Sequence, residues 1–138
     1  MAAAGGSRQD AIEAVTRRGA AMENVFVARD SRLGGRVPAV GADWALLSFT
    51  GGSATLISEC SSVAETVDAI ESRARQSERP ISVAVGHAGR EVEAAADDLA
   101  HRLIGSEAIQ TVERYRVGAS IGAHTGPDSF GMFWWPTQ

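Results

Sequence analysis

The chain has 138 residues, which suits one compact domain and is short for two. Hydrophobic residues make up 44% of it and the formal net charge is −4, so a core can form and no strongly basic surface is expected. Neither a basic stripe nor interleaved aromatic and basic residues occur, which argues against nucleic-acid binding. The single cysteine, Cys60, excludes a disulfide within the chain. No apolar run approaches the roughly 20 residues that cross a bilayer, and the amino-terminal residues are unlike a signal peptide, so we expect a cytoplasmic protein.

The amino-terminal part of the chain predicts a short tail and a helix. Residues 1–6 are small and glycine-rich, and we expect them to be disordered, with residues 7–138 forming one domain. Ser7 and Asp10 have the spacing of a helix start, and Gly19 is placed to stop that helix.

A strand and a hairpin are predicted next. Residues 24–28 are rich in β-branched and aromatic side chains and predict a strand, and the glycines and proline within 29–38 indicate an irregular loop. Residues 44–50 and 53–58 are apolar runs separated by Gly51-Gly52, which is typical of a β-hairpin.

The second half of the chain alternates between helical and strand patterns. Ser62 and Glu65 have the spacing of a capping box, in which the serine hydroxyl accepts from one amide and the glutamate reaches back to another. The remaining predicted elements are a helix at 63–76, a strand at 81–86, a helix at 90–104, a strand at 109–117 and a closing strand at 129–135 after a glycine-rich turn. This order predicts an α+β two-layer sandwich, in which two main helices pack on one mixed, mostly antiparallel sheet.

The most specific stretch runs from residue 117 to residue 132. Three glycines surround His124 and Thr125, and Gly126 is followed by proline. Glycines let the backbone turn tightly and let a ligand approach the main chain. An imidazole and a hydroxyl at the tip of such a turn, with exposed amides nearby, suit a carboxylate or phosphate.

This stretch resembles the end of DegV-family proteins, which close with an Ile-Gly-x-His-x-Gly-Pro-Gly pattern and an apolar strand. Upstream, Leu33-Gly34-Gly35-Arg36-Val37 resembles the family's Leu-x-x-Gly-Gly-Arg-Ile segment. The order of hairpin, helix, strand and helix between the two motifs is also similar. The resemblance is to the C-terminal domain only, and it covers roughly residues 10 to 136.

The resemblance implies a function in lipid binding. DegV-family proteins are bacterial two-domain proteins that bind a long-chain fatty acid between their halves, and some present its carboxylate to a separate kinase. By resemblance, His124 and Arg36 fall on residues near the carboxylate, with Thr125 and Gly126 beside them. The implied partners are a fatty acid or other acyl carboxylate, and a second copy or another protein that supplies the N-terminal half. No cofactor is implied, and the three histidines do not have a metal-ligand spacing.

Several positions depart from the family pattern. By this resemblance we expect the chain to lack the family's N-terminal domain, which supplies much of the pocket wall in the family, and the loop before Gly34 is shorter. Residues 58–62 replace a basic segment. Asp128 stands where the family usually has glycine, and a carboxylate there opposes anion binding unless it points away.

The apolar carboxy-terminal residues are the remaining site candidates. Adjacent side chains of a strand point to opposite faces, so Trp134 and Trp135 cannot share one core. We therefore expect one of them, together with Phe133, to line a pocket or an interface. His87 and Cys60 have neighbours that favour structural roles.

Three functional hypotheses follow. The first is a stand-alone acyl-chain-binding protein that completes its pocket by association with another chain. The second is a small biosynthetic enzyme on the same fold, with His124 as general acid or base. No nucleophile with a base and an orienting group can be identified in the sequence, which places the enzyme second. The third is a structural partner subunit that binds no ligand.

Overall fold

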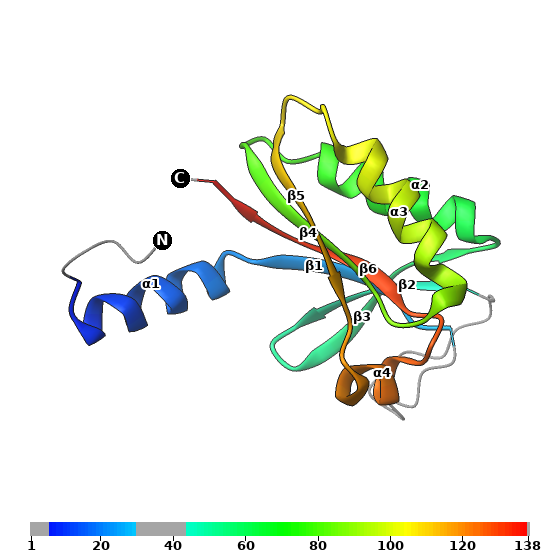
Figure 1. The fold of residues 1–138 in the computed structure, drawn as a ribbon, viewed down its shortest axis with the longest axis horizontal. Helices are drawn as coiled ribbons and strands as arrows, with labels where there is room; N and C mark the ends of the chain where they lie inside the picture. Colours follow the sequence, from blue (N-terminus) through cyan, green and yellow to red (C-terminus); the bar gives the residue numbers. More distant parts are fainter. Residues whose placement is uncertain (1–5, 30–43, 138) are drawn as a thin grey trace.

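The structure is a computed structural model that describes residues 6–29 and 44–137. Its elements run in the order α1 (Arg8–Ala20), β1 (Glu23–Val27), β2 (Trp44–Thr50), β3 (Ser53–Cys60), α2 (Val63–Arg75), β4 (Ile81–His87), the 3₁₀ helix η2 (Arg90–Val92), α3 (Glu93–Leu103), β5 (Ile109–Arg116), α4 (Ala119–Thr125) and β6 (Phe130–Pro136) (Figure 1). Most of the predicted tail and most of the predicted loop at 29–38 lie outside the described residues. No helix in the described part is long and apolar enough to cross a membrane.

One six-stranded sheet organises the fold. Its strand order is β3-β2-β1-β6-β4-β5, so the last strand of the chain lies in the middle of the sheet. Among the strands of the described residues, only β4 and β5 pair in parallel, and the other four pairs are antiparallel. The predicted mixed, mostly antiparallel sheet is confirmed, and so is the predicted hairpin: Gly51 and Gly52 both have positive φ, which favours glycine over other residues.

The helices α2 and α3 pack side by side on one face of the sheet (Figure 1). Apolar side chains recur along both helices at helical spacing and meet the inward side chains of the central strands. The core includes Val67, Ile70, Leu99 and Leu103 from the helices and Val25, Val83, Val85, Phe130 and Met132 from the strands. The prediction of two main helices on the same sheet face is therefore confirmed.

Ion pairs join the outer surfaces of these two helices. Arg102 Nη1 lies 2.7 Å from Asp68 Oδ1 on α2, and Arg102 Nη2 lies 2.7 Å from Asp98 Oδ2 one turn earlier on α3. The second of these contacts has the i,i+4 spacing at which charged side chains meet on one face of a helix. Arg102 thus fixes the two helices to each other at the surface.

The start of α2 differs from the predicted capping box by one residue. Ser62 is the N-cap, and its hydroxyl accepts from the Glu65 N–H as expected. The Glu65 carboxylate, however, accepts from the N–H and the hydroxyl of Ser61, at 2.7 and 2.6 Å. The serine before the cap therefore completes the box.

Helix α1 begins at its predicted cap but extends away from the sheet (Figure 1). Ser7 and Asp10 form a complete capping box. Gly19 does not stop the helix, which continues to Ala20. The apolar side chains of Ile12 and Val15 are exposed, and Val15 is 72% accessible. Within the described residues, α1 buries no side chain.

Candidate functional site

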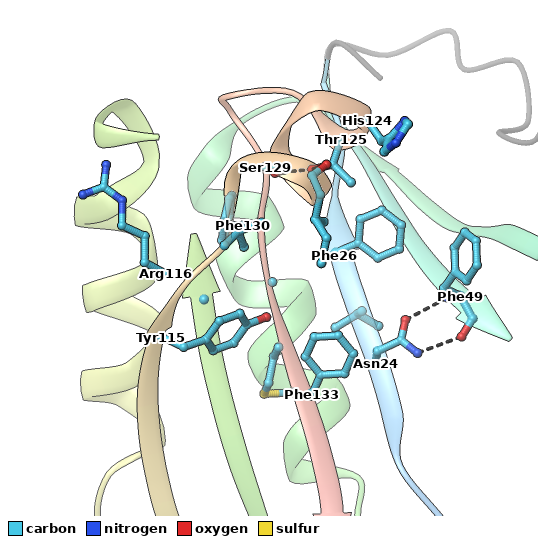
Figure 2. A pocket seen from close by; sticks show the side chains of 17 residues that line it. Asn24, Phe26, Phe49, Tyr115, Arg116, His124, Thr125, Ser129, Phe130 and Phe133 are labelled. Carbon is cyan, nitrogen blue, oxygen red and sulfur yellow. Dashed lines mark hydrogen bonds between the residues drawn. The ribbon is translucent and has the colours of Figure 1, made fainter. Parts of the chain in front are cut away.

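The sheet face opposite α2 and α3 carries a groove of about 630 Å³. Among the described elements, the short helix α4 lies at one end of this groove (Figure 2). The side chains along it are mostly apolar and aromatic, and they come from strands that are far apart in sequence. The lining includes Asn24, Phe26, Phe49, Gly86, Tyr115, Ile121, His124, Thr125, Ser129, Gly131 and Phe133.

A row of paired residues crosses the sheet beneath the groove. Phe26 pairs with Gly131, Gly131 with Gly86, and Gly86 with Tyr115. The two glycines sit side by side on β6 and β4, between aromatic residues on β1 and β5. Because glycine has no side chain, the flanking residues Phe26 and Tyr115 can lie close against the backbone here.

The ring of Tyr115 lies directly over Gly86. A methyl group at position 86 would stand 2.1 Å from Tyr115 Cζ, which is far inside van der Waals contact. The Tyr115 ring also faces the Phe133 ring, with centroids 6.2 Å apart and a tilt of 48°. Burial in this apolar setting raises the pKa of the Tyr115 hydroxyl.

Asn24 joins β1 to β2 at the side of the groove. Its Nδ2 donates to the Phe49 carbonyl and its Oδ1 accepts from the Phe49 N–H, both at 2.8 Å. The side-chain amide thus replaces a backbone partner between the two strands (Figure 2). The Phe26 and Phe49 rings, 6.4 Å apart, line this side.

The predicted glycine-rich turn is instead the helix α4, which corrects the sequence interpretation. The amides of Gly122 and Gly126 donate to Gly118 and Gly122 carbonyls, so they are not available to an anion. His124 and Thr125 lie in the last turn, where the helix dipole is negative. Any anion-binding role of this end must therefore come from side chains rather than from a cradle of backbone amides.

Two hydroxyl groups meet at the carboxyl end of α4. Thr125 Oγ1 lies 2.8 Å from Ser129 Oγ, to which it can donate, and 3.2 Å from the Ile121 carbonyl O. Ser129 Oγ donates to the Gly126 carbonyl at 2.9 Å. Gly126 has a φ of +88°, which lets the chain reverse into β6. The two hydroxyls therefore form a fixed polar cluster at this end of the groove.

The structure brings some of the predicted head-group residues together. His124, which is exposed, and Thr125 both line the groove. Gly126 is buried at the end of α4 and shapes the turn rather than lining the groove. Arg36 lies outside the described residues, so its distance from His124 stays a prediction.

The carboxy-terminal aromatic residues separate as the strand alternation requires. Phe133 lines the groove and is 38% exposed. Trp134 points to the opposite face and belongs to the core under the helices. Trp135 is on the same face as Phe133, is half-buried, and does not line the groove.

Other candidate residues have structural partners. Asp128 Oδ2 lies 3.7 Å from Arg29 Nη1, so a cation offsets its charge beside the site. His87 is buried and its Nδ1 lies 3.0 Å from the Gly89 carbonyl O. Cys60 is buried in the core. Within the described residues, no three histidine, cysteine, aspartate or glutamate side chains gather closely enough to hold a metal ion.

Sequence reasoning missed most of the groove wall. Asn24, Phe26, Phe49, Tyr115 and Ser129 were not predicted as site residues. The available signal was a pair of glycines inside otherwise apolar strands, at 86 and 131, since such glycines often mark a close approach of backbone or ligand.

Comparison with known proteins agrees with this architecture. The family described as "Uncharacterised protein, DegV family" matches residues 45–137. No curated protein matches the chain.

Solved structures of DegV proteins share the fold at low sequence identity. A DegV family protein from Corynebacterium glutamicum superposes with a TM-score of 0.80 at 16% identity, covering 96% of this chain and 54% of that one. One from Eubacterium eligens, loaded with heptadecanoic acid, gives 0.79 at 14%, with 96% and 51% covered. A fatty-acid-binding DegV family protein from Thermus thermophilus gives 0.78 at 17%, with 96% and 52% covered. The chain thus spans about half the length of these proteins.

The sheet, the two packed helices and the family match over residues 45–137 agree with one another. The chain belongs to the DegV family.

Proposed function

We propose that this protein binds the acyl chain of a fatty acid, or of another acyl carboxylate, in the groove on the open sheet face. The observation that carries the proposal is the groove itself. Its volume of about 630 Å³ falls in the range of small-molecule sites, roughly 300–1,000 Å³. Its walls are aromatic, and the Thr125 and Ser129 hydroxyls lie together with the His124 imidazole at the end near α4. An amphiphile with one polar end matches that distribution.

Burial of methylenes would supply the binding energy. Each buried methylene contributes about 0.8 kcal/mol, so ten of them contribute on the order of 8 kcal/mol, which corresponds to a micromolar dissociation constant. Ordering the flexible chain and losing its free motion reduce that value. Affinity should therefore depend strongly on how much of the chain is covered.

The polar cluster at the end of α4 is the proposed site of the carboxylate. Thr125 and Ser129 provide hydroxyl groups, and His124 provides an imidazole within the same lining. Arg36 is proposed as the charged partner of the carboxylate, on the family resemblance alone. Asp128 does not oppose this arrangement, because Arg29 lies beside its carboxylate.

A second protein surface is proposed to cover the groove. Among the described residues, the exposed large hydrophobic side chains fall mainly into two groups. Phe49, Ile121 and Phe133 border the groove, and Ile12, Val15 and Met22 lie on or just after α1. Apolar groups collected in this way mark surfaces that bind a ligand or a partner. A homodimer or a heteromeric complex would cover both groups of side chains. We also propose that the protein is cytoplasmic.

A charge placed in the groove tests the proposal. We expect Phe133→Asp to weaken binding of a long-chain fatty acid about 10- to 100-fold, because it removes roughly 1.5–3 kcal/mol of apolar burial. Phe133 is partly exposed, so the change should leave the fold intact. Isothermal titration calorimetry with the delipidated protein measures the effect.

Ile104→Asp is the matched control. Ile104 is 63% exposed at the end of α3 and does not line the groove. The account expects wild-type affinity in this variant. Equal losses in both variants, or the absence of fatty-acid binding in the wild type, would contradict the proposal. Native mass spectrometry of the same samples reports whether ligand binding changes the number of chains in the complex.

A further inference from the structure

We propose that the Tyr115 ring closes the groove on the β5 side and thereby limits the length of the acyl chain that the groove accepts. This inference rests on the acyl-binding function proposed above. It adds the residue that determines specificity for chain length.

The first observation is the position of the ring over Gly86. Tyr115 and Gly86 are paired on the parallel strands β5 and β4. The ring occupies the space that a side chain at position 86 would fill, since a methyl group there would stand 2.1 to 2.5 Å from three ring carbons. Tyr115 thus takes up the part of the groove floor that the glycine leaves empty.

The second observation is the contact between Tyr115 and Phe133. The two rings come from β5 and β6, which flank β4, and their centroids are 6.2 Å apart. Together they span the strand on which Gly86 lies. An apolar chain that crosses the glycine floor toward β5 therefore meets two ring surfaces.

The third observation is where this aromatic pair lies relative to the polar end. Figure 2 shows Tyr115 and Phe133 at the opposite end of the view from Thr125 and Ser129. A carboxylate at the polar end directs the methyl end of its chain toward the two rings. Among the described residues, none beyond these two rings on β5 or β6 lines the groove, so methylenes that extend past them should add little to affinity.

The Tyr115 hydroxyl offers a competing explanation that the same experiment addresses. Within the described part of the chain, no hydrogen bond holds this hydroxyl, so it could instead select ligands through a polar contact. Tyr115→Phe keeps the ring and removes only the hydroxyl. A steric limit is unchanged in that variant, whereas selection by a hydrogen bond is lost.

The experiment measures calorimetric affinities of the full chain for saturated fatty acids of increasing length. In the wild type and in Tyr115→Phe, affinity should rise about fourfold per methylene and then level off at the same length. In Tyr115→Ala, the rise should continue for several further methylenes. Adding Gly86→Val to Tyr115→Ala refills the vacated space from the neighbouring strand, and should return the limit toward that of the wild type.

If circular dichroism shows that Tyr115→Ala does not fold, Tyr115→Leu replaces it in the experiment. Tyr115→Leu should move the limit on chain length by a smaller amount. If the wild type binds with a clear limit on chain length and the Tyr115 variants keep that limit, the proposed role of Tyr115 is overturned. The proposed acyl-binding function would be unaffected by that result. A limit that moves in Tyr115→Phe would overturn the steric explanation. A wild type that binds no fatty acid of any length would instead contradict the proposed function itself.

Discussion

The structure limits the ways in which His124 can contribute to binding an anion. It lies in the last turn of α4 and lines the groove beside Thr125. The backbone amides of this turn bond within the helix, so an anion at this end depends on side chains. Figure 2 shows His124 and the Thr125–Ser129 hydroxyl pair at the same end of the groove.

Substitution of His124 should weaken binding of a fatty acid. Its imidazole lines the groove together with Thr125 and Ser129, where it can hydrogen-bond a carboxylate. We expect His124→Ala to cost about 0.5–1.5 kcal/mol, or roughly two- to tenfold. We expect Arg36→Ala to cost about 1.5–3 kcal/mol, or roughly ten- to a hundredfold. Calorimetric titration of both variants measures this.

His101→Ala is the control, because His101 is exposed on α3 and does not line the groove. Unchanged affinity in both His124→Ala and Arg36→Ala would remove the head-group site from the account. If His124 were instead a general acid or base, binding would persist in His124→Ala while turnover of a substrate collapsed. The same variant therefore separates the binding protein from the enzyme.

At the scale of elements, the start of α2 shows how local chemistry fixes a helix end. The Ser61 hydroxyl and N–H both donate to the Glu65 carboxylate, at 2.6 and 2.7 Å. These two hydrogen bonds, the hydroxyl's first, lower the pKa of Glu65 below its ordinary 4.5. A carboxylate with a lowered pKa in the folded protein stabilises the fold only while it is ionised.

The midpoint of thermal unfolding should therefore depend on pH through Glu65. The contribution is fully present above the ordinary pKa of 4.5 and is lost as the pH falls through the lower folded-state pKa. In Glu65→Gln the midpoint should fall less than that of the wild type between about pH 6 and pH 3. Circular dichroism measures the midpoints.

Glu107→Gln, which changes an exposed residue before β5, provides the comparison. It should follow the wild-type curve across the same range of pH. A Glu65→Gln curve that coincides with the wild-type curve would show that the Ser61–Glu65 contacts do not contribute to stability.

Helices and strands could be predicted where the signal was local. Ser7 with Asp10, Ser62 with Glu65 and the Gly51-Gly52 turn each depend on a few neighbouring residues, and each element begins or turns where the sequence indicates. Helix α4 was missed because Gly118 and Gly122 have low helix propensity. In the structure, this segment nevertheless forms the short helix α4 (Ala119–Thr125).

At the scale of the whole molecule, the groove could not be predicted because it depends on strand order. Phe26 on β1 is separated by most of the chain from Tyr115 on β5 and Phe133 on β6. The three side chains line one groove because β6 inserts between β1 and β4. The alternation within each strand shows which side chains share a face, but it does not show which strands are neighbours.

The family resemblance supplied what strand alternation could not. Its implied fold is confirmed by the sheet order, the packed helices and the match over residues 45–137. Its implied ligand and partner remain proposals, because the similar solved structures share 14–17% identity and about twice this length. Because the groove is formed by residues of this chain, fatty-acid binding can be tested without a partner protein.

The most direct test of an acyl-binding groove is an NMR titration of the ¹⁵N-labelled chain with a long-chain fatty acid. We expect the largest amide shift changes at Gly86, Gly131 and Phe133. We also expect nuclear Overhauser effects between acyl methylenes and the rings of Phe26 and Tyr115. Shift changes confined to α2 and α3, or no change at the two glycines at saturating ligand, would contradict the central claim.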